Sequence, residues 1–184
     1  MASELHTAGH NTKAQHGFSY PISSLNKLRE KSKQYVHPSY DPNAALVPHG
    51  VAVALTAPAV FNFTAPSSPS RHRDAAAIFM GKDRAHELNN VKDADIGAVL
   101  SEEIQRFLDA VEVPRGLTQV GYGTQDINSV SLHLTLISTV LIVQLVMGAL
   151  PQRRVLNLAP GLSRDNQEEE KEQLSGIIEK SLSW

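Results

Sequence analysis

The chain of 184 residues contains no cysteine, which excludes disulfides, thiolate-bound zinc, iron–sulfur clusters and thiol catalysis. Aromatic residues make up only 5%, and neither sign of charge dominates, because 17 Lys and Arg stand against 19 Asp and Glu. This balance gives no general electrostatic reason to bind nucleic acid or an acidic membrane. The composition is otherwise that of one ordinary globular domain. Any metal must be bound by His, Asp, Glu or water, and eight His are present.

Several common motifs are also missing. Gly121-Tyr122-Gly123 is not followed by the further glycine of a nucleotide-binding loop, and no serine nucleophile elbow occurs. The first residues form neither a secretory signal nor an Arg-rich mitochondrial presequence. The basic run from Lys27 to Lys33, with Arg29 inside it, is interrupted by Glu30 and has few aromatic neighbours. It is therefore predicted to be a solvated helix face and not a nucleic-acid patch.

One long run without formal charge is present, at residues 127–152. Its apolar centre, residues 132–150, is long enough to cross a bilayer. The run also carries polar Ser, Thr, His and Gln side chains and many β-branched residues, and no aromatic belt flanks it. These features favour a buried segment over a membrane span.

Helical periodicity fills most of the remaining chain. Residues 51–63 are apolar almost all round, which predicts the most buried helix, kinked at Pro58. Ser70 is predicted to cap a helix over residues 71–80 that Gly81 closes. A further helix is predicted from seven apolar residues at helical spacing between Ile96 and Val111.

The last predicted helix follows a cap at Ser163 or Asp165 and has an apolar face formed by Leu174, Ile177, Ile178 and Leu182. No alternating strand pattern and no internal repeat occur, so the predicted fold class is all-α. Residues 1–14 have no periodic pattern and are predicted to be irregular. Residues 15–184 are predicted to form one helical domain, interrupted by an apolar insertion at about residues 130–144.

Three histidine patterns are candidates for a metal site. His6 and His10 have the i, i+4 spacing of two ligands on one helix face, but Gly9 lies between them and no helical pattern supports the segment. A solvated tail is the simpler interpretation. His16 and His49 are each followed by glycine, and His49 opens the apolar helix. A metal would need these imidazoles neutral, oriented by hydrogen bonds, and joined by further ligands.

Two longer stretches surround these histidines, His16-Gly-Phe-Ser-Tyr-Pro-Ile-Ser-Ser24 and Leu46-Val-Pro-His-Gly-Val-Ala-Val-Ala54. They resemble the iron-containing (group III) alcohol dehydrogenases, most closely their hydroxyacid-oxoacid transhydrogenase branch. Others follow in the family's order, among them Leu55 to Thr64, Arg71-His72, Gly116 to Tyr122, Asp126-Ile127, and Gly148 to Arg153 with Leu158-Ala-Pro160. The resemblance covers about residues 15–184, apart from one insertion.

The resemblance implies an all-helical, metal-binding C-terminal domain of the dehydroquinate synthase-like fold. It implies that His16 and His49 are metal ligands, that the metal is Fe²⁺ or Zn²⁺, and that a mitochondrial enzyme carries hydride on bound NAD(P). The substrates would be small hydroxyacids and oxoacids, with 4-hydroxybutyrate oxidised to succinate semialdehyde and 2-oxoglutarate reduced to D-2-hydroxyglutarate. Many family members have a histidine where this chain has Tyr20, and we expect Tyr20 to orient substrate or relay a proton.

The chain also departs from the family. It has no N-terminal α/β nucleotide domain and no Asp-x-x-x-His pair, which supplies the other two metal ligands in that family. His6 and His10 do not replace this pair. We therefore expect a fragment of a metal-dependent oxidoreductase that is inactive in isolation.

The insertion has a feature of its own. Removal of Val130–Gln144 would join Ser129 to Leu145 and restore a helical stripe through Ile127, Leu145, Val146 and Leu150. An intron begins with GT and ends with AG. Valine codons begin with GT, and the glutamine codon CAG ends with AG, so the segment can have both borders of an intron. We hypothesise that these 15 residues are a retained intron. A spliced transcript that carries these codons at full abundance would refute the hypothesis.

A second interpretation is a small membrane-associated or partner-binding helical protein built around residues 130–150. It accounts for the apolar run but not for the ordered His-Gly motifs. Solubility without detergent distinguishes the two interpretations.

Overall fold

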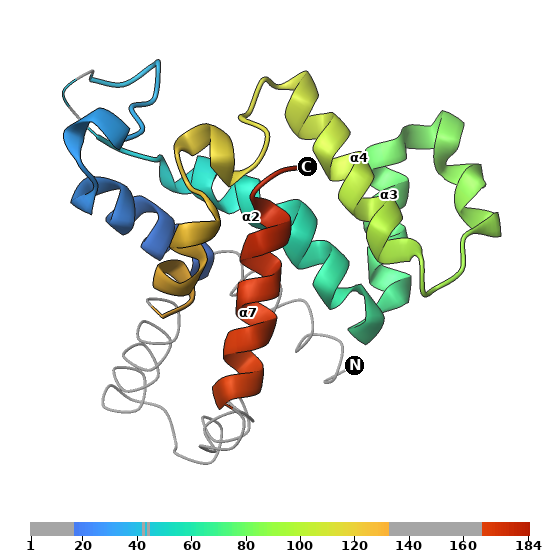
Figure 1. Ribbon diagram of the computed structural model, residues 1–184. Coiled ribbons are helices and arrows are strands. Elements are labelled where there is room, and N and C mark those ends of the chain that lie inside the picture. The colour runs from blue at the N-terminus through green and yellow to red at the C-terminus, as the bar shows by residue number, and fades with distance from the viewer. Residues whose placement is uncertain (1–16, 42, 44, 133–166) are drawn as a thin grey trace, which may run out of the picture.

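The computed structural model describes residues 17–41, 43, 45–132 and 167–184. Every regular element in these residues is helical and none of them forms a strand, so the all-α prediction is confirmed for this part of the chain. The predicted irregular segment 1–14 and the predicted cap at Ser163 or Asp165 lie outside it. Figure 1 shows α2 crossing the middle of the molecule, with α3 and α4 on one side and the helix at residues 17–28 on the other.

The first part of the chain forms the helix at residues 17–28, the short 3-10 turn η1 (Lys31–Lys33) and a loop that leads into α2 (His49–Thr64). Pro58 lies inside α2 and does not end it. Its partners explain why α2 is apolar almost all round. It contributes Ala52, Leu55, Ala59 and Val60 to one hydrophobic cluster, while Ala54, Ala57 and Phe61 pack against a second cluster.

The middle of the chain forms a hairpin of α3 (Pro69–Arg84) and α4 (Ile96–Ala110), linked by η3 (Ala85–Asn90). The short η2 (Ala65–Ser67) connects α2 to α3. The predicted cap was wrong, because Ser68 and not Ser70 precedes the helix. Pro69 occupies the first helical position, where its fixed φ and missing N–H suit the start of a helix. Gly81 breaks the helical geometry with φ 73°, close to where the sequence predicted the end.

The α4 prediction is confirmed in position, and its inner stripe of Ile96, Leu100, Ile104 and Leu108 is buried. Burial does not separate residues 51–63 from α4: six of these 13 residues are buried, against seven of the 15 residues of α4. The two ends of α2 reach the surface, where His49, Gly50 and Phe63 are exposed, so an apolar sequence does not bury its whole length.

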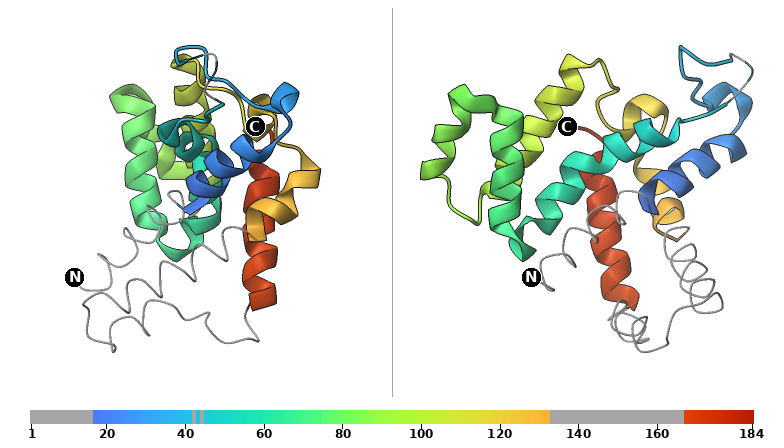
Figure 2. Two further views of the ribbon diagram at one scale, coloured as in Figure 1. Left: turned by 90° about the vertical axis from the view of Figure 1, so that its left-hand side faces the viewer. Right: turned by 180° about the vertical axis from the view of Figure 1, so that it is seen from behind.

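The last part of the chain returns to α2. The turns η4 (Leu117–Val120) and η5 (Thr124–Asp126) lead into a helical stretch at residues 127–132, and α7 (Gln167–Ser181) packs across α2. Figure 2 shows this crossing from two further sides. The predicted apolar face of α7 is confirmed, because Ile177, Ile178 and Leu182 are buried in the first cluster and Leu174 packs against it.

Two hydrophobic clusters follow from this arrangement. The first joins helix 17–28, α2, the segment around η4 and α7, and its members run from Phe18 to Leu182. The second lies between α3, α4 and the end of α2, and its members run from Ala65 to Leu108. The α2 helix connects the two clusters.

Most of the apolar run at residues 127–152 lies outside the described residues, although Val130 and Ser131 are fully buried against the first cluster and α7. Among the described residues, the helical stretch His49–Ser67 is long and apolar enough to cross a membrane by length and composition alone. Here it is the central helix, against which α4 and α7 pack.

Candidate metal centre

The start of helix 17–28 lies against the start of α2. Phe18 and Ile22, one turn apart, are buried in the first hydrophobic cluster and fix this face of the helix to the core. Ser19 is also fully buried, whereas Tyr20 is 49% exposed. Two neighbouring residues of one helix therefore present a buried hydroxyl and a solvent-facing phenol at the same place.

Both side chains contact His49, the first residue of α2. Its Nδ1 lies 2.9 Å from the hydroxyl oxygen of Ser19. The Tyr20 ring lies 5.5 Å from the imidazole, centroid to centroid, with the planes tilted by 53°. Imidazole, phenol and buried hydroxyl thus form one cluster at the surface where the two helices begin.

One turn further along the helix, the Ser23 hydroxyl donates a hydrogen bond to the carbonyl oxygen of Val47, at 2.9 Å. Val47 is itself buried in the first cluster. The segment that carries His49 is therefore fastened to helix 17–28 at two successive turns.

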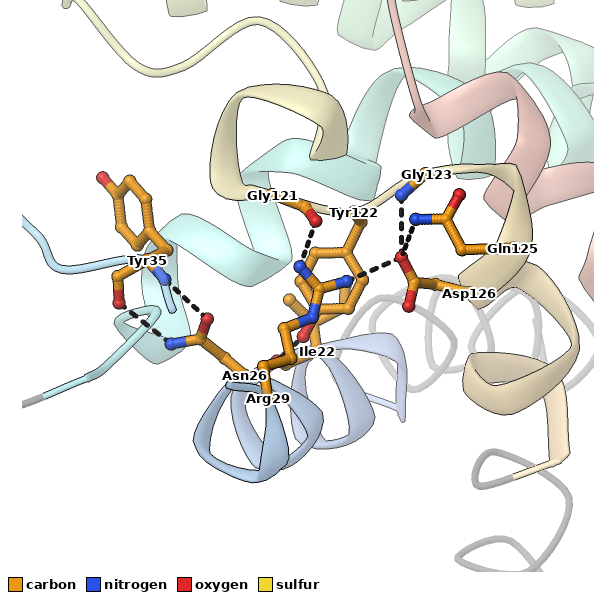
Figure 3. A network of polar contacts seen from close by, with 9 residues as sticks. All are labelled: Ile22, Asn26, Arg29, Tyr35, Gly121, Tyr122, Gly123, Gln125 and Asp126. Carbon is orange, nitrogen blue, oxygen red and sulfur yellow. Dashed lines mark hydrogen bonds and ion pairs between the residues drawn. The ribbon is translucent and has the colours of Figure 1, made fainter. Parts of the chain in front are cut away.

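A third group of contacts holds the other end of helix 17–28, and Figure 3 shows it. Arg29 donates hydrogen bonds to the Gly121 carbonyl and to Asp126 Oδ2, the latter at 2.6 Å, and its guanidinium lies 3.9 Å from the centre of the Tyr122 ring. Asp126 Oδ2 also accepts the backbone N–H of Gly123 at 2.8 Å. We call Arg29, Tyr122 and Asp126 the arginine clamp.

The arginine clamp corrects the prediction of a solvated basic face. Lys27, Lys31 and Lys33 are exposed, but only 14% of the Arg29 side chain is accessible. The Tyr122 hydroxyl donates to the Ile22 carbonyl, and burial raises the pKa of this phenol well above its usual value. Asn26 completes the contacts, because its side-chain amide bonds to both backbone groups of Tyr35, at 2.9 and 2.8 Å.

Two other buried polar side chains have partners that account for them. His72 bonds through Nε2 to the Thr64 hydroxyl at 3.1 Å and through Nδ1 to the Ser68 carbonyl at 2.8 Å, so both ring nitrogens hold the corner between α2 and α3. Glu103 on α4 pairs with Arg84 and Arg106. These groups serve the fold.

The structure describes two of the three predicted site residues, Tyr20 and His49. Tyr20 and His49 are brought together. His16 lies outside the described residues, as do His6 and His10, so the sharing of one ion by His16 and His49 stays a prediction. Within residues 17–41, 43, 45–132 and 167–184, no three His, Asp or Glu side chains are grouped closely enough to hold a metal.

The donor chemistry at His49 nevertheless fits a divalent transition metal. Imidazole is a preferred ligand of Zn²⁺ and Fe²⁺, and a metal-binding imidazole normally uses its second nitrogen in a hydrogen bond that fixes the ring. Ser19 is such a partner for Nδ1. Sequence reasoning missed Ser19, although it stands three residues after His16 within the stretch that carries the family resemblance.

A helical bundle with an imidazole held at a helix start defines a candidate metal-binding domain, and comparison with known proteins identifies its class. Residues 30–136 match the family model described as "Fe-containing alcohol dehydrogenase family, C-terminal". The chain belongs to the iron-containing alcohol dehydrogenases, a family of enzymes.

Similar curated proteins carry a more particular name. The chain is 39% identical over 168 residues to the mitochondrial hydroxyacid-oxoacid transhydrogenase of Xenopus tropicalis. The match covers 91% of this chain and 29% of that protein. The chain is 39% identical over 145 residues to the human protein of that name, covering 79% of this chain and 26% of that protein. A probable mitochondrial hydroxyacid-oxoacid transhydrogenase of Dictyostelium discoideum is 42% identical over 147 residues. The match covers 80% of this chain and 22% of that protein. No solved structure matches the chain significantly.

Proposed function

We propose that this chain supplies the metal-binding helical part of a hydroxyacid-oxoacid transhydrogenase, with His16 and His49 as two of the ligands to Fe²⁺ or Zn²⁺. The observation that carries the proposal is the convergence of Ser19 and Tyr20 on His49. The chain spans less than a third of the length of the relatives named above, so the remaining ligands and the nucleotide site would belong to other segments.

The reaction that fits this assignment interconverts small hydroxyacids and oxoacids, with 4-hydroxybutyrate and 2-oxoglutarate as the expected substrates. Hydride would be carried by bound NAD(P), and the relatives' names favour a mitochondrial location. A bound divalent metal supplies Lewis-acid stabilisation of an alkoxide oxygen. In this chain, His49 would hold the ion, and Tyr20 would orient the substrate or relay its hydroxyl proton at the solvent-facing side of the imidazole.

Metal titration of the chain tests the ligand assignment. We expect Zn²⁺ to bind weakly, because neutral imidazoles without a carboxylate do not offset the lost hydration of the dication. His16→Ala and His49→Ala should each weaken Zn²⁺ binding by about tenfold or more, measured by competition with a chromophoric chelator. His37→Ala and His86→Ala, which remove exposed or partly exposed histidines elsewhere, are the controls. Equal affinity of the chain and its His49→Ala variant would refute the assignment.

Turnover in a whole-length enzyme carrying this segment tests the catalytic role. His49→Ala should abolish turnover and not merely raise KM, because charge stabilisation by the ion is needed most in the transition state. Tyr20→Phe should lower kcat by about 10²–10⁴ if the phenol relays a proton. A rise in KM alone would assign Tyr20 to substrate orientation.

A further inference from the structure

Ser19 and Ser23 form a pair of hydroxyls one turn apart on helix 17–28, and both bond to the segment that leads into α2. Ser23 donates to a backbone carbonyl, that of Val47, whereas Ser19 contacts the side chain of His49. The two serines therefore fasten the same segment but act on different groups. Of the two serines, Ser19 is the one that contacts the imidazole directly.

Ser19 stands where packing alone would favour an apolar residue. It is fully buried, its neighbour Phe18 is buried, and Ile22 on the next turn is buried in the same cluster. A hydroxyl in such a place costs free energy unless it is hydrogen bonded, and alanine is the better helix former. The contact with His49 Nδ1 gives this position a reason for a hydroxyl.

The chemistry of this contact has two forms. A serine hydroxyl can donate or accept a hydrogen bond, and a neutral imidazole carries one proton. If Ser19 accepts from Nδ1–H, the lone pair lies on Nε2, where a metal ion can bind it. If Ser19 donates to Nδ1, the proton lies on Nε2 and that nitrogen cannot be a ligand. The choice of tautomer decides whether His49 offers Nε2 to an ion.

We propose that Ser19 is a positioning residue whose hydroxyl accepts the Nδ1–H of His49 and thereby fixes the tautomer and ring orientation in which Nε2 binds a divalent metal. The proposal rests on the metal-binding role of His49 proposed above. Tyr20 supports it, because its ring lies beside the imidazole and limits the orientations that the ring can take.

The first experiment needs no metal. In ¹⁵N-histidine spectra of the neutral imidazoles, His49 should be protonated at Nδ1. Ser19→Ala should shift it toward the Nε2–H form, whereas Ser23→Ala, which removes the matched hydroxyl one turn away, should leave the tautomer unchanged. A predominant Nε2–H form in the unsubstituted chain would overturn the proposal, and this result needs no variant that has to fold.

The second experiment measures Zn²⁺ affinity. Ser19→Ala should weaken binding by about 10- to 100-fold, the usual effect of losing a group that orients a metal ligand. Ser19→Thr, which keeps a hydroxyl, should retain most of the affinity, and Ser23→Ala should stay within about twofold of the unsubstituted chain. Circular dichroism checks that each variant is folded.

The outcomes separate this proposal from the proposed function. If Zn²⁺ binds through His49 and Ser19→Ala changes neither affinity nor tautomer, the positioning role is overturned while the metal role stands. If the tautomer depends on Ser19 but His49→Ala leaves Zn²⁺ affinity unchanged, the metal role is overturned, and the positioning role toward a metal falls with it.

Discussion

At the scale of single residues, Asp126 has the most concentrated set of contacts in the arginine clamp. One of its carboxylate oxygens accepts hydrogen bonds from Arg29, from the Gly123 backbone and from the Gln125 side chain. The Arg29 and Asp126 side chains are 14% and 25% exposed, so solvent screens their attraction less than it screens a surface pair. The clamp should therefore contribute measurably to stability.

Asp126→Asn removes the charge and keeps the shape. We expect it to lower the free energy of unfolding by about 1–3 kcal/mol, because it leaves the Arg29 charge without its counter-ion. Urea denaturation measures the change. The control is Glu30→Gln, which removes the same charge from the Lys33–Glu30 pair, whose side chains are 70% and 72% exposed. That variant should change stability by no more than about 0.5 kcal/mol, and equal effects would contradict the distinction.

Tyr122 predicts a pH dependence. Burial raises the pKa of its phenol, so the folded chain keeps this proton at a pH where the unfolded chain releases it. The resulting stability is fully present below the ordinary tyrosine pKa of about 10 and is lost as pH rises beyond it. Tyr122→Phe should be less stable than the unsubstituted chain near neutral pH, because it loses the hydrogen bond to Ile22, and the difference should shrink above about pH 10. A constant difference across that range would contradict this reasoning.

The residue scale is also where sequence reasoning was weakest. The run from Lys27 to Lys33 predicts a solvated face, and this holds for the lysines. Arg29 differs because its partner Asp126 is 97 positions away in the chain, and no local pattern reports such a contact. Ser19 was missed for a similar reason, since its partner is 30 positions away.

At the scale of elements, the contact between α2 and α4 depends on Gly97. A Cβ placed there would lie 2.7 Å from Ala65 Cβ and 2.9 Å from the Asn62 carbonyl oxygen, closer than such atoms pack. The two helices therefore approach each other through a residue that has no side chain.

Gly97→Ala should destabilise the protein by about 1–3 kcal/mol, because the overpacking outweighs the gain in helix propensity. Gly176→Ala in α7 is the matched control, since a Cβ there meets no atom of the other described residues within 4 Å. That variant should stabilise by about 0.5–1 kcal/mol. Thermal unfolding of both variants checks the opposite signs, and two variants of equal stability would refute the close approach.

Elements were easier to predict than their burial. The α4 helix was located correctly because its apolar stripe is periodic. The apolar face of α7 was predicted correctly for the same reason. The burial of residues 51–63 was predicted less well at their end, where Phe63 is exposed, because an apolar sequence does not reveal where its partners end. The start of α3 was misplaced because two serines flank Pro69, and the fixed geometry of proline decided between them.

At the scale of the whole molecule, we predict that the 184-residue chain neither retains NAD(H) nor interconverts 4-hydroxybutyrate and 2-oxoglutarate, whatever metal is supplied. The sequence contains no glycine-rich phosphate loop, and the described residues contain no complete metal site. Catalysis needs hydride donor, acceptor and Lewis acid in contact, and a displacement of about 1 Å costs about a hundredfold in rate. Coupled turnover assays and nucleotide analysis of the purified chain test this. Metal-dependent activity above the blank would contradict it.

The candidate site could be predicted from the sequence only as a pair of His-Gly motifs. Their resemblance to a family led to His49 and Tyr20, and the structure places these two side chains together. The hydrogen bond that orients the imidazole could not be predicted, because it depends on the angle at which helix 17–28 meets α2. That angle is set by the packing of both helices in the first cluster.

The way the chain returns to α2 has a consequence for the order of folding. The Leu182 carbonyl accepts hydrogen bonds from the backbone and side chain of Thr118, and the Trp184 indole donates to the Leu55 carbonyl, 129 positions earlier. The buried members of the second cluster all lie between Ala65 and Leu108, whereas the first must bring Phe18 together with Leu182. Closing the longer loop has the larger entropic cost. On a ribosome, the α3–α4 hairpin can therefore become compact before α7 is synthesised. The first cluster, which surrounds the start of α2 and His49, is completed only after α7 has been made.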